Sequence, residues 1–269
     1  MTIAAEDPPK YTTALCKGQG MIAETITLLR EWQPGMSAAE LSKKVVAEGI
    51  IPKGTAARVN DIVSRVFAFR YLADEARPAR QLKRLIDAGA TPSLLSQLLL
   101  IHTARAHPEL HDFITTVYWP RYAAGAKEIF RHESVDFYKS AYDSWRLPCE
   151  WTETSRTKIA RYLLSTLTDF GLTGPVHGEK RDILPFAPKL STSIYLAYDL
   201  HFRGVSDGQI PAHRDWQLFG LEPKDALAEL NRTSASGQII IQHSGEILRV
   251  AWKHKTMEAF LDELAQGHI

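Results

Sequence analysis

The spacing of apolar residues predicts a chain that is mainly helical. Within residues 19–32, Ile22, Ile26 and Leu29 recur on one helical stripe, and Pro34-Gly35 ends the run. Similar patterns predict further helices over residues 37–49, 56–72, 75–88, 91–106, 109–118, 121–145, 152–170, 190–202, 223–232 and 255–266.

Two of these helices form a pair with clear start signals. Ser37 is followed three residues later by Glu40, which is the capping-box pattern. After a short turn, Thr55 is in position to cap the next helix. Helix, tight turn and helix is the helix-turn-helix layout, whose second helix enters the DNA major groove.

Two stretches predict small β-hairpins. Residues 171–186 contain two extended pieces around a Gly-Pro-Val-His-Gly loop, directly after the helix over 152–170. Residues 238–252 alternate around Ser244-Gly245, the clearest hairpin signal in the chain. A helix followed by a hairpin is how a winged helix ends. The predicted fold is therefore mainly α with small β-hairpins, and helix-turn-helix or winged-helix-like units lie at both ends of a helical middle.

The same pattern suggests where domains begin and end. Pro148 breaks the helical pattern and marks a boundary. We expect a flexible tail over 1–10, an N-terminal helix-turn-helix unit over 11–77, a helical middle region over 78–148 and a C-terminal winged-helix-like region over 149–269.

Composition fits an ordinary globular protein. The 269 residues are 45% hydrophobic and 23% charged, with a formal net charge of +1, so any nucleic-acid surface must be a local patch. The chain has two cysteines, too few for a disulfide framework, which favours a reducing, cytoplasmic compartment. The N-terminal MTIAAEDPPK lacks the features of a signal peptide, and no apolar run approaches the length of a membrane span.

The segment GQGMIA at residues 18–23 matches the G-x-G-x-x-A pattern of a dinucleotide-binding turn. That motif needs a buried strand before it and an acidic residue after a second strand about 20 residues on. Neither is predicted here. We therefore expect these glycines to let the backbone pack closely at the entry to a helix, and we expect no cofactor.

Other catalytic and metal-binding patterns are weak. His102, His107 and His111 are close in sequence, but Pro108 interrupts the helix that would align them, so we expect surface or cap histidines rather than a metal site. No G-x-S-x-G motif or family-specific cysteine motif occurs. A metal-dependent nuclease built from distant carboxylates stays open as a third class of function; we expect no enzyme, no catalytic residue and no metal.

Between residues 53 and 84 the chain has eight basic residues and only three acidic ones, so positive charge is concentrated there. On the helix over 56–72, a 100° wheel places Val59, Ile62, Val63, Val66, Phe67 and Phe69 on one apolar arc. The opposite arc holds Asn60, Asp61, Ser64 and Arg65 with small residues, and Arg58 lies at its edge. Such side chains suit contacts to bases and phosphates.

The helix over 152–170 repeats this arrangement. Its apolar arc is Ile159, Leu163, Leu167 and Phe170, and its polar arc has two cations, three hydroxyls and no acid: Thr157, Lys158, Arg161, Ser165 and Thr168. Two basic helix units in one chain favour nucleic-acid binding. The predicted DNA-contacting residues are Lys17, Lys53, Thr55, Arg58, Asn60, Ser64, Arg65, Lys158, Arg161, Lys180 and Arg181.

Several motifs resemble the BrxA family of BREX phage-defence systems. They are Tyr11-x-x-x-Leu15-x-Lys17-Gly18, the segment GIIPKGTxxRV at 49–59, Phe170-Gly171-Leu172, Asp215-Trp216-x-x-Phe219-Gly220-Leu221 and the final hairpin. The resemblance implies a non-catalytic, cytoplasmic DNA-binding protein with helix-turn-helix or winged-helix units. It further implies partners in a methyltransferase, a phosphatase-like protein and an ATPase. The hydropathy of the chain predicts no membrane association.

The alternative is a protein–protein scaffold within the defence complex. Exposure of Tyr118, Trp119 and Trp145 would favour it, because aromatic anchors mark protein interfaces.

Overall fold

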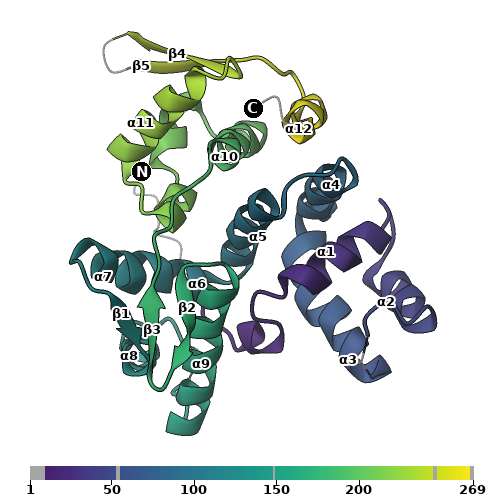
Figure 1. Cartoon of the computed structure of the whole chain (residues 1–269), viewed down its shortest axis with the longest axis vertical. Coiled ribbons are helices and arrows are strands. Elements are labelled where there is room, and N and C mark those ends of the chain that lie inside the picture. Colours follow the sequence, from purple (N-terminus) through teal and green to yellow (C-terminus); the bar gives the residue numbers. More distant parts are fainter. Residues whose placement is uncertain (1–9, 53–54, 148, 245–246, 267–269) are drawn as a thin grey trace, which may run out of the picture. The chain divides into compact units, whose positions relative to one another are not determined.

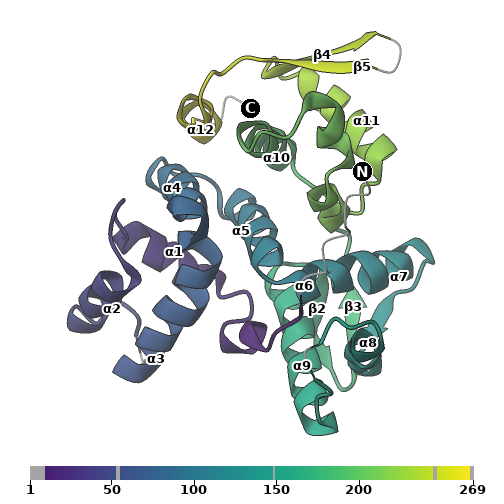
Figure 2. The same ribbon diagram turned by 180° about the vertical axis from the view of Figure 1, so that it is seen from behind.

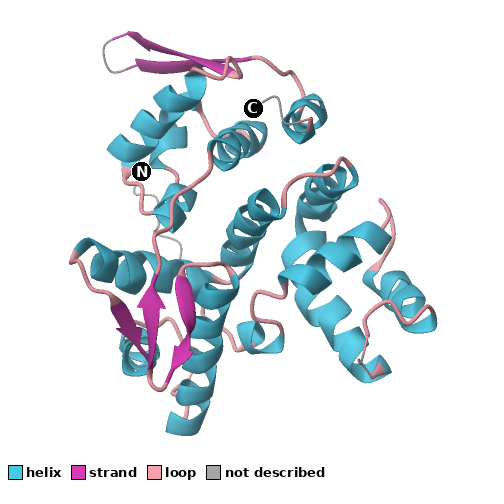
Figure 3. Cartoon of the chain, viewed as in Figure 1, coloured by secondary structure: helices cyan, strands magenta, loops and turns pink. Residues whose placement is uncertain are grey.

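The computed structural model describes residues 10–52, 55–147, 149–244 and 247–266. It is mainly helical with two small antiparallel sheets (Figure 3), as the sequence predicts. The predicted tail lies outside the described residues except for Lys10. The chain forms two compact units, each built from two separate stretches: Met1–Met21 with Thr103–Pro185, and Ile22–His102 with Phe186–Ile269.

This division differs from the consecutive regions 11–77, 78–148 and 149–269 that the sequence suggests. Each unit is completed by a stretch more than 80 positions away, and such pairing is decided by tertiary packing rather than by local signals.

In the first unit, a three-stranded antiparallel sheet packs beside two helices (Figures 1 and 2). β3 (Lys180–Ile183) is the central strand, paired with β1 (Glu128–Phe130) on one side and β2 (Thr173–His177) on the other. α8 (Arg131–Asp143) packs against β1 and α9, and α9 (Glu153–Asp169) runs beside β2.

The strand β1 corrects one prediction. The expected single helix over 121–145 is instead α7, a strand and α8. The chain leaves α7 through Gly125, whose φ of +76° favours glycine. α8 begins where the Glu133 carboxylate accepts the Phe130 N–H at 2.8 Å.

The elements before β1 are η1 (Ala14–Lys17), α6 (Pro108–Phe113), the π-helical η3 (Ile114–Tyr118) and α7 (Trp119–Ala123).

The N-terminal segment of this unit packs on α9, and GQGMIA supplies the closest approach. Tyr11 and Leu15 are buried, and η1 contacts α9. The Gly20 N–H donates to the Asp169 carboxylate at 2.9 Å, and a Cβ added to Gly20 would lie 2.5 Å from the Asp169 Cβ. The expectation that a glycine here allows close backbone packing is confirmed.

The second unit begins with five α-helices and one π-helical segment. The capping box of Ser37 and Glu40 forms as predicted, and the Thr55 hydroxyl accepts the Arg58 N–H. The elements are α1 (Ile22–Glu31), α2 (Ala38–Ala47), α3 (Ala56–Asp61), η2 (Ile62–Leu72), α4 (Ala73–Asp87) and α5 (Pro92–Ala106).

The π-helical winding of η2 changes which residues are buried. Val63, Val66 and Phe67 are buried as predicted, but Phe69 is 46% exposed. A π-helix bonds residues five apart rather than four, so positions late in η2 rotate away from a 100° wheel. The next residues include Asp74, whose φ of +53° begins three consecutive left-handed residues that kink the chain before the regular part of α4.

The rest of the second unit packs around α10 (Leu190–Phe202), which contacts both α11 and α12. The predicted terminal hairpin forms, with β4 paired to β5 and lying over α11 (Figure 1). Its turn residue Gly245 lies outside the described residues. The elements are η4 (Asp207–Ala212), η5 (Arg214–Phe219), α11 (Pro223–Ser234), β4 (Ile239–Ser244), β5 (Ile247–Trp252) and α12 (Met257–Ala265).

Among the described residues, every helix falls short of the length and apolarity that crossing a bilayer requires. In the same part of the chain, no three His, Cys, Asp or Glu side chains gather as metal ligands would. His102, His107 and His111 are all buried rather than at the surface, and His107 lies at the N-cap of α6.

Candidate nucleic-acid interface

The helix α9 presents two faces, as its sequence predicts. Thr152 caps it by accepting the Ser155 N–H at 3.3 Å, which fixes its first turn. Ile159, Leu163 and Leu167 are at most 3% exposed and hold the helix against the unit's core. The opposite face is therefore positioned by buried contacts that do not involve its polar side chains.

The polar face of α9 divides into two parts with different roles. Lys158 and Arg161 lie exposed toward its N-terminal half. Farther along, the Ser165 and Thr168 hydroxyls each lie 3.1 Å from a guanidinium nitrogen of Arg181 on β3. The first part faces solvent, while the second connects α9 to the hairpin.

The sequence predicts that Arg181 contacts phosphate, but in the structure its side chain is buried. Its side chain is 6% exposed, and burial lowers the pKa of its guanidinium below the usual arginine value. Its two bonds to α9 hydroxyls hold the hairpin against the helix. We therefore treat Arg181 as a positioning residue beneath the surface rather than as a phosphate contact.

Two adjoining hollows run along the exposed face of α9. The first, which we call the α9 groove, has a volume of about 450 Å³ and is lined by Arg131, Glu153, Thr154, Thr157, Lys158 and Arg161. The second, of about 170 Å³, lies between α9 and the β2–β3 hairpin, and Lys180 lines it. Arg131 and Arg161 line both, so the two hollows form one continuous surface.

The charges on this surface differ in how far they are neutralised. Arg131 pairs with Glu179, and Lys180 pairs with Glu128 at 2.5 Å, a hydrogen bond that raises the Lys180 pKa. Exposed ion pairs of this kind are weak and exchange readily.

Lys158 and Arg161 are the cations of the α9 groove with which no carboxylate of the described residues pairs. The Arg161 guanidinium lies 5.4 Å from the ring centroid of Tyr162, a contact that leaves its N–H edges open. Glu153 is the acid that lines the groove.

The second predicted set lies on α3 and the start of η2, in the other compact unit. Arg58 is exposed, and Arg65 pairs with Asp61 at 3.0 Å. The Ser64 hydroxyl donates to the Asn60 carbonyl at 2.5 Å, and the Asn60 side-chain oxygen accepts from Ser42 of α2. The Thr55 hydroxyl is used as the α3 cap. Most of these side chains therefore already have a partner within the unit.

Two predicted residues lie apart from both sets. Lys53 lies outside the described residues. Lys17 is half-buried in η1 beside α9 and does not line the α9 groove. The structure therefore brings together Lys158, Arg161 and Lys180, with Arg181 beneath them.

Sequence reasoning missed one cation of this surface, Arg131. It begins α8 directly after β1, and the overlooked strand hid its position. The alternation in Glu128-Ile129-Phe130 was the available signal, but three residues are too few to separate a strand from a helix. Thr154 was missed as well, although it falls one turn before Lys158 on the same stripe.

Comparison with known protein families gives a match. The sequence profile of the BrxA family matches residues 9–198, which is well over half of the chain. No curated protein matches it.

Proposed function

We propose that this chain, which belongs to the BrxA family and is a component of a BREX phage-defence system, is a non-catalytic protein that binds duplex DNA. The observation that carries the proposal is the α9 groove, where Lys158 and Arg161 face solvent without a carboxylate partner among the described residues. Cations that are not neutralised within the protein can displace counterions from phosphates at low cost.

The order of elements in the first unit supports this role. Helix, strand, helix, helix and two-stranded hairpin follow one another, with strand order β1-β3-β2. We interpret this arrangement as a winged-helix unit in which α9 enters the major groove and the hairpin lies along the neighbouring backbone. The Arg181 bonds to α9 would then keep helix and hairpin at a fixed spacing.

In this arrangement, the residues of the α9 groove have distinct tasks. Lys158 and Arg161 would bind phosphates, and the Thr154 and Thr157 hydroxyls would donate to phosphate or base edges. Arg131 would exchange its Glu179 partner for a phosphate, because an exposed pair holds it only weakly. Few groups reach base edges, so sequence specificity should be modest.

The pair α2 and α3 would provide a second contact. The bond from Ser42 to Asn60 ties the two helices together, as a helix-turn-helix requires. Arg58 is exposed, whereas Arg65 would have to release Asp61. We expect this contribution to be smaller than that of the α9 groove.

A fluorescence anisotropy titration with labelled duplex DNA tests the proposal. Lys158→Ala/Arg161→Ala should weaken binding about ten- to a hundred-fold at low salt, and Arg58→Ala/Arg65→Ala should weaken it less. The matched control is Lys127→Ala/Lys139→Ala, which removes two exposed cations of the same unit that line neither hollow. If the control weakens binding as much as the α9 variant, only overall charge matters and the proposed surface is wrong.

A scaffold role is the second candidate, and one observation favours it. Trp145 is 79% exposed and Tyr142 is 44% exposed near the end of α8, whereas Tyr118 is buried and belongs to the core. Exposed aromatic residues are typical anchors of protein interfaces. Co-purification with the co-expressed methyltransferase, phosphatase-like protein and ATPase should then fall with Trp145→Ala. Unchanged recovery of all three partners would exclude this anchor.

A further inference from the structure

Two cavities of the second unit share Arg80 of α4 as a common wall. The cationic cavity, of about 690 Å³, is lined by Arg77, Arg80, Lys83, Arg84 and Lys255 among other residues. The apolar cavity, also of about 690 Å³, is lined mainly by apolar side chains, among them Trp32, Met36, Phe69 and Leu72, together with Arg80 and Glu75. Each volume lies within the range of small-molecule sites, and neither cavity involves the α9 groove.

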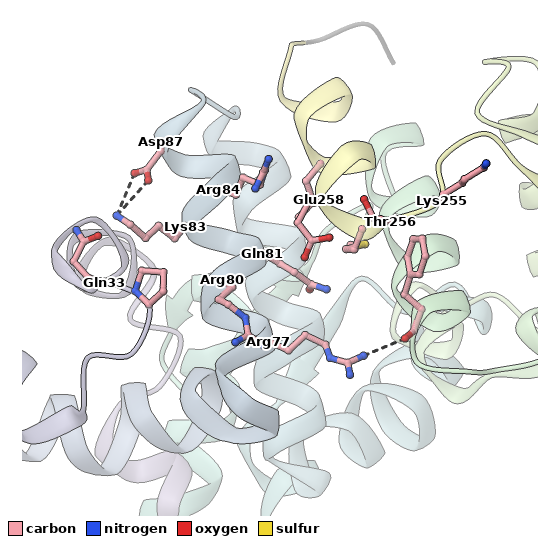
Figure 4. Close-up of a pocket in the computed structure, with 14 residues that line it drawn as sticks. Gln33, Arg77, Arg80, Gln81, Lys83, Arg84, Asp87, Lys255, Thr256 and Glu258 are labelled. Carbon is pink, nitrogen blue, oxygen red and sulfur yellow. Dashed lines mark hydrogen bonds and ion pairs between the residues drawn. The ribbon is translucent and has the colours of Figure 1, made fainter.

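The cations of the first cavity come mainly from one helix. Figure 4 shows Arg77, Arg80, Lys83 and Arg84 extending from α4, with Gln33 on one side of the helix and α12 on the other. Residues three or four apart on a helix are neighbours, so like charges at these positions repel one another. An acidic partner or an anionic ligand offsets this repulsion.

Most of these cations already have an acidic partner. Arg84 binds Asp262 through two nitrogens, at 2.5 and 2.7 Å, and Lys83 lies 3.2 Å from Asp87. Arg80 is exposed, and no acid of the described residues pairs with it. Arg80, which lines both cavities, is therefore also the cation of the cluster that is most available to a ligand.

Arg77 is held in place beside it by a chain of polar contacts. It donates to the Phe202 carbonyl at 3.3 Å and lies 3.3 Å from Asp74 (Figure 4 shows the first contact). Asp74 also accepts from Arg203, which binds the fully buried Asp199 at 2.8 Å. A guanidinium fixed in this way loses little further freedom on binding an anion.

The apolar cavity offers a flat surface close to these charges. Phe69 is 46% exposed although a 100° wheel places it on the buried side of η2, because the π-helical winding turns it outward. Trp32 lines the same cavity and is fixed by its indole N–H, which donates to the Met36 carbonyl at 2.9 Å. An exposed aromatic face beside arginines is the combination on which nucleic-acid bases stack.

We propose that the two cavities together bind a nucleotide unit, with its phosphates at Arg77 and Arg80 and its base against Phe69. The shared chemistry is a phosphate-bearing ligand with an aromatic base, supplied by a free nucleotide or by a single-stranded nucleic acid. Arginine binds phosphate oxygens through paired N–H groups, and the apolar side chains of the second cavity offer a contact surface for the base. This site is independent of duplex binding by α9.

Isothermal titration calorimetry of the full chain with ATP, tripolyphosphate, adenosine and an oligothymidylate tests this site. ATP should bind, and Arg80→Ala should lower its affinity about ten-fold or more, as expected for the loss of a charge-assisted contact. Phe69→Leu should weaken ATP several-fold but leave tripolyphosphate unchanged, because only the base stacks. Lys43→Ala removes an exposed cation of α2 outside both cavities and should change nothing.

The oligothymidylate distinguishes the two sources of the ligand. The site is assigned to single strands if the oligothymidylate binds more tightly than ATP, competes with ATP and depends on Arg80. It is assigned to free nucleotides if ATP binds and the oligothymidylate does not. If neither binds, or if folded Arg80→Ala and Arg80→Gln both bind like the wild type, the proposal is overturned. Lys158→Ala/Arg161→Ala must retain ATP binding; a loss there would place the ligand on the α9 groove instead.

Discussion

The close approach of Gly20 to α9 makes a strong prediction for Gly20→Ala. The new Cβ would lie 2.5 Å from the Asp169 Cβ, an atom fixed to the helix backbone that cannot rotate away. Either the N-terminal segment or the end of α9 must shift, and overpacking of this kind costs about 1–3 kcal/mol. The shift also lengthens the 2.9 Å bond from the Gly20 N–H to the carboxylate, a bond to a charged group that contributes about 1.5–3 kcal/mol.

Because the two effects overlap, we expect Gly20→Ala to destabilise the protein by about 2–4 kcal/mol. Urea unfolding measures the total, and amide exchange in peptides from α9 localises it. Gly208→Ala is the matched control, since a Cβ there meets nothing within 4 Å and its φ is not left-handed. Asp169→Ala keeps the Cβ and removes the carboxylate that accepts this bond. Equal stability of Gly20→Ala and Gly208→Ala would refute the packing of this segment on α9.

Three further predictions concern single side chains. Arg181→Ala should cost about 2–4 kcal/mol in urea unfolding, because it removes a buried guanidinium and its two bonds to α9; a loss below about 0.5 kcal/mol, typical of surface positions, would show that it faces solvent. Ser37→Ala should cost about 1 kcal/mol through loss of the capping box, and no change in the urea midpoint would contradict this. Burial raises the pKa of the Cys16 thiol to about 11, whereas Cys149 is exposed. At pH 8 a thiol reagent should therefore modify Cys149 much faster than the half-buried Cys16, and equally fast reactions at both would contradict this difference.

Local features of this fold were predictable because short-range chemistry determines them. Ser37 and Thr55 cap their helices as expected, and the apolar arc of α9 is buried at Ile159, Leu163 and Leu167. These outcomes depend on hydrogen bonds within one turn and on helical periodicity, which the sequence records directly.

Features that depend on distant contacts were not predictable. The three residues of β1 become a strand only because β3, about 50 positions later, pairs with them. Arg181 lies between the charged residues Lys180 and Asp182, so its hairpin sequence does not indicate burial; its bonds to the α9 hydroxyls depend on a contact that the sequence does not show. Phe69 is exposed because η2 is π-helical, and a 100° wheel cannot represent that winding. The composition of each unit from two separate stretches has the same origin.

The most direct test of duplex binding by the α9 groove is the salt dependence of DNA affinity. Each phosphate contact contributes about 0.9 to the slope of log K against log salt concentration. Lys158→Ala/Arg161→Ala should therefore reduce the magnitude of that slope by about 2, whereas Lys127→Ala/Lys139→Ala should leave it unchanged. An unchanged slope for the α9 variant, or no measurable duplex binding by the wild type at low salt, would contradict the proposal.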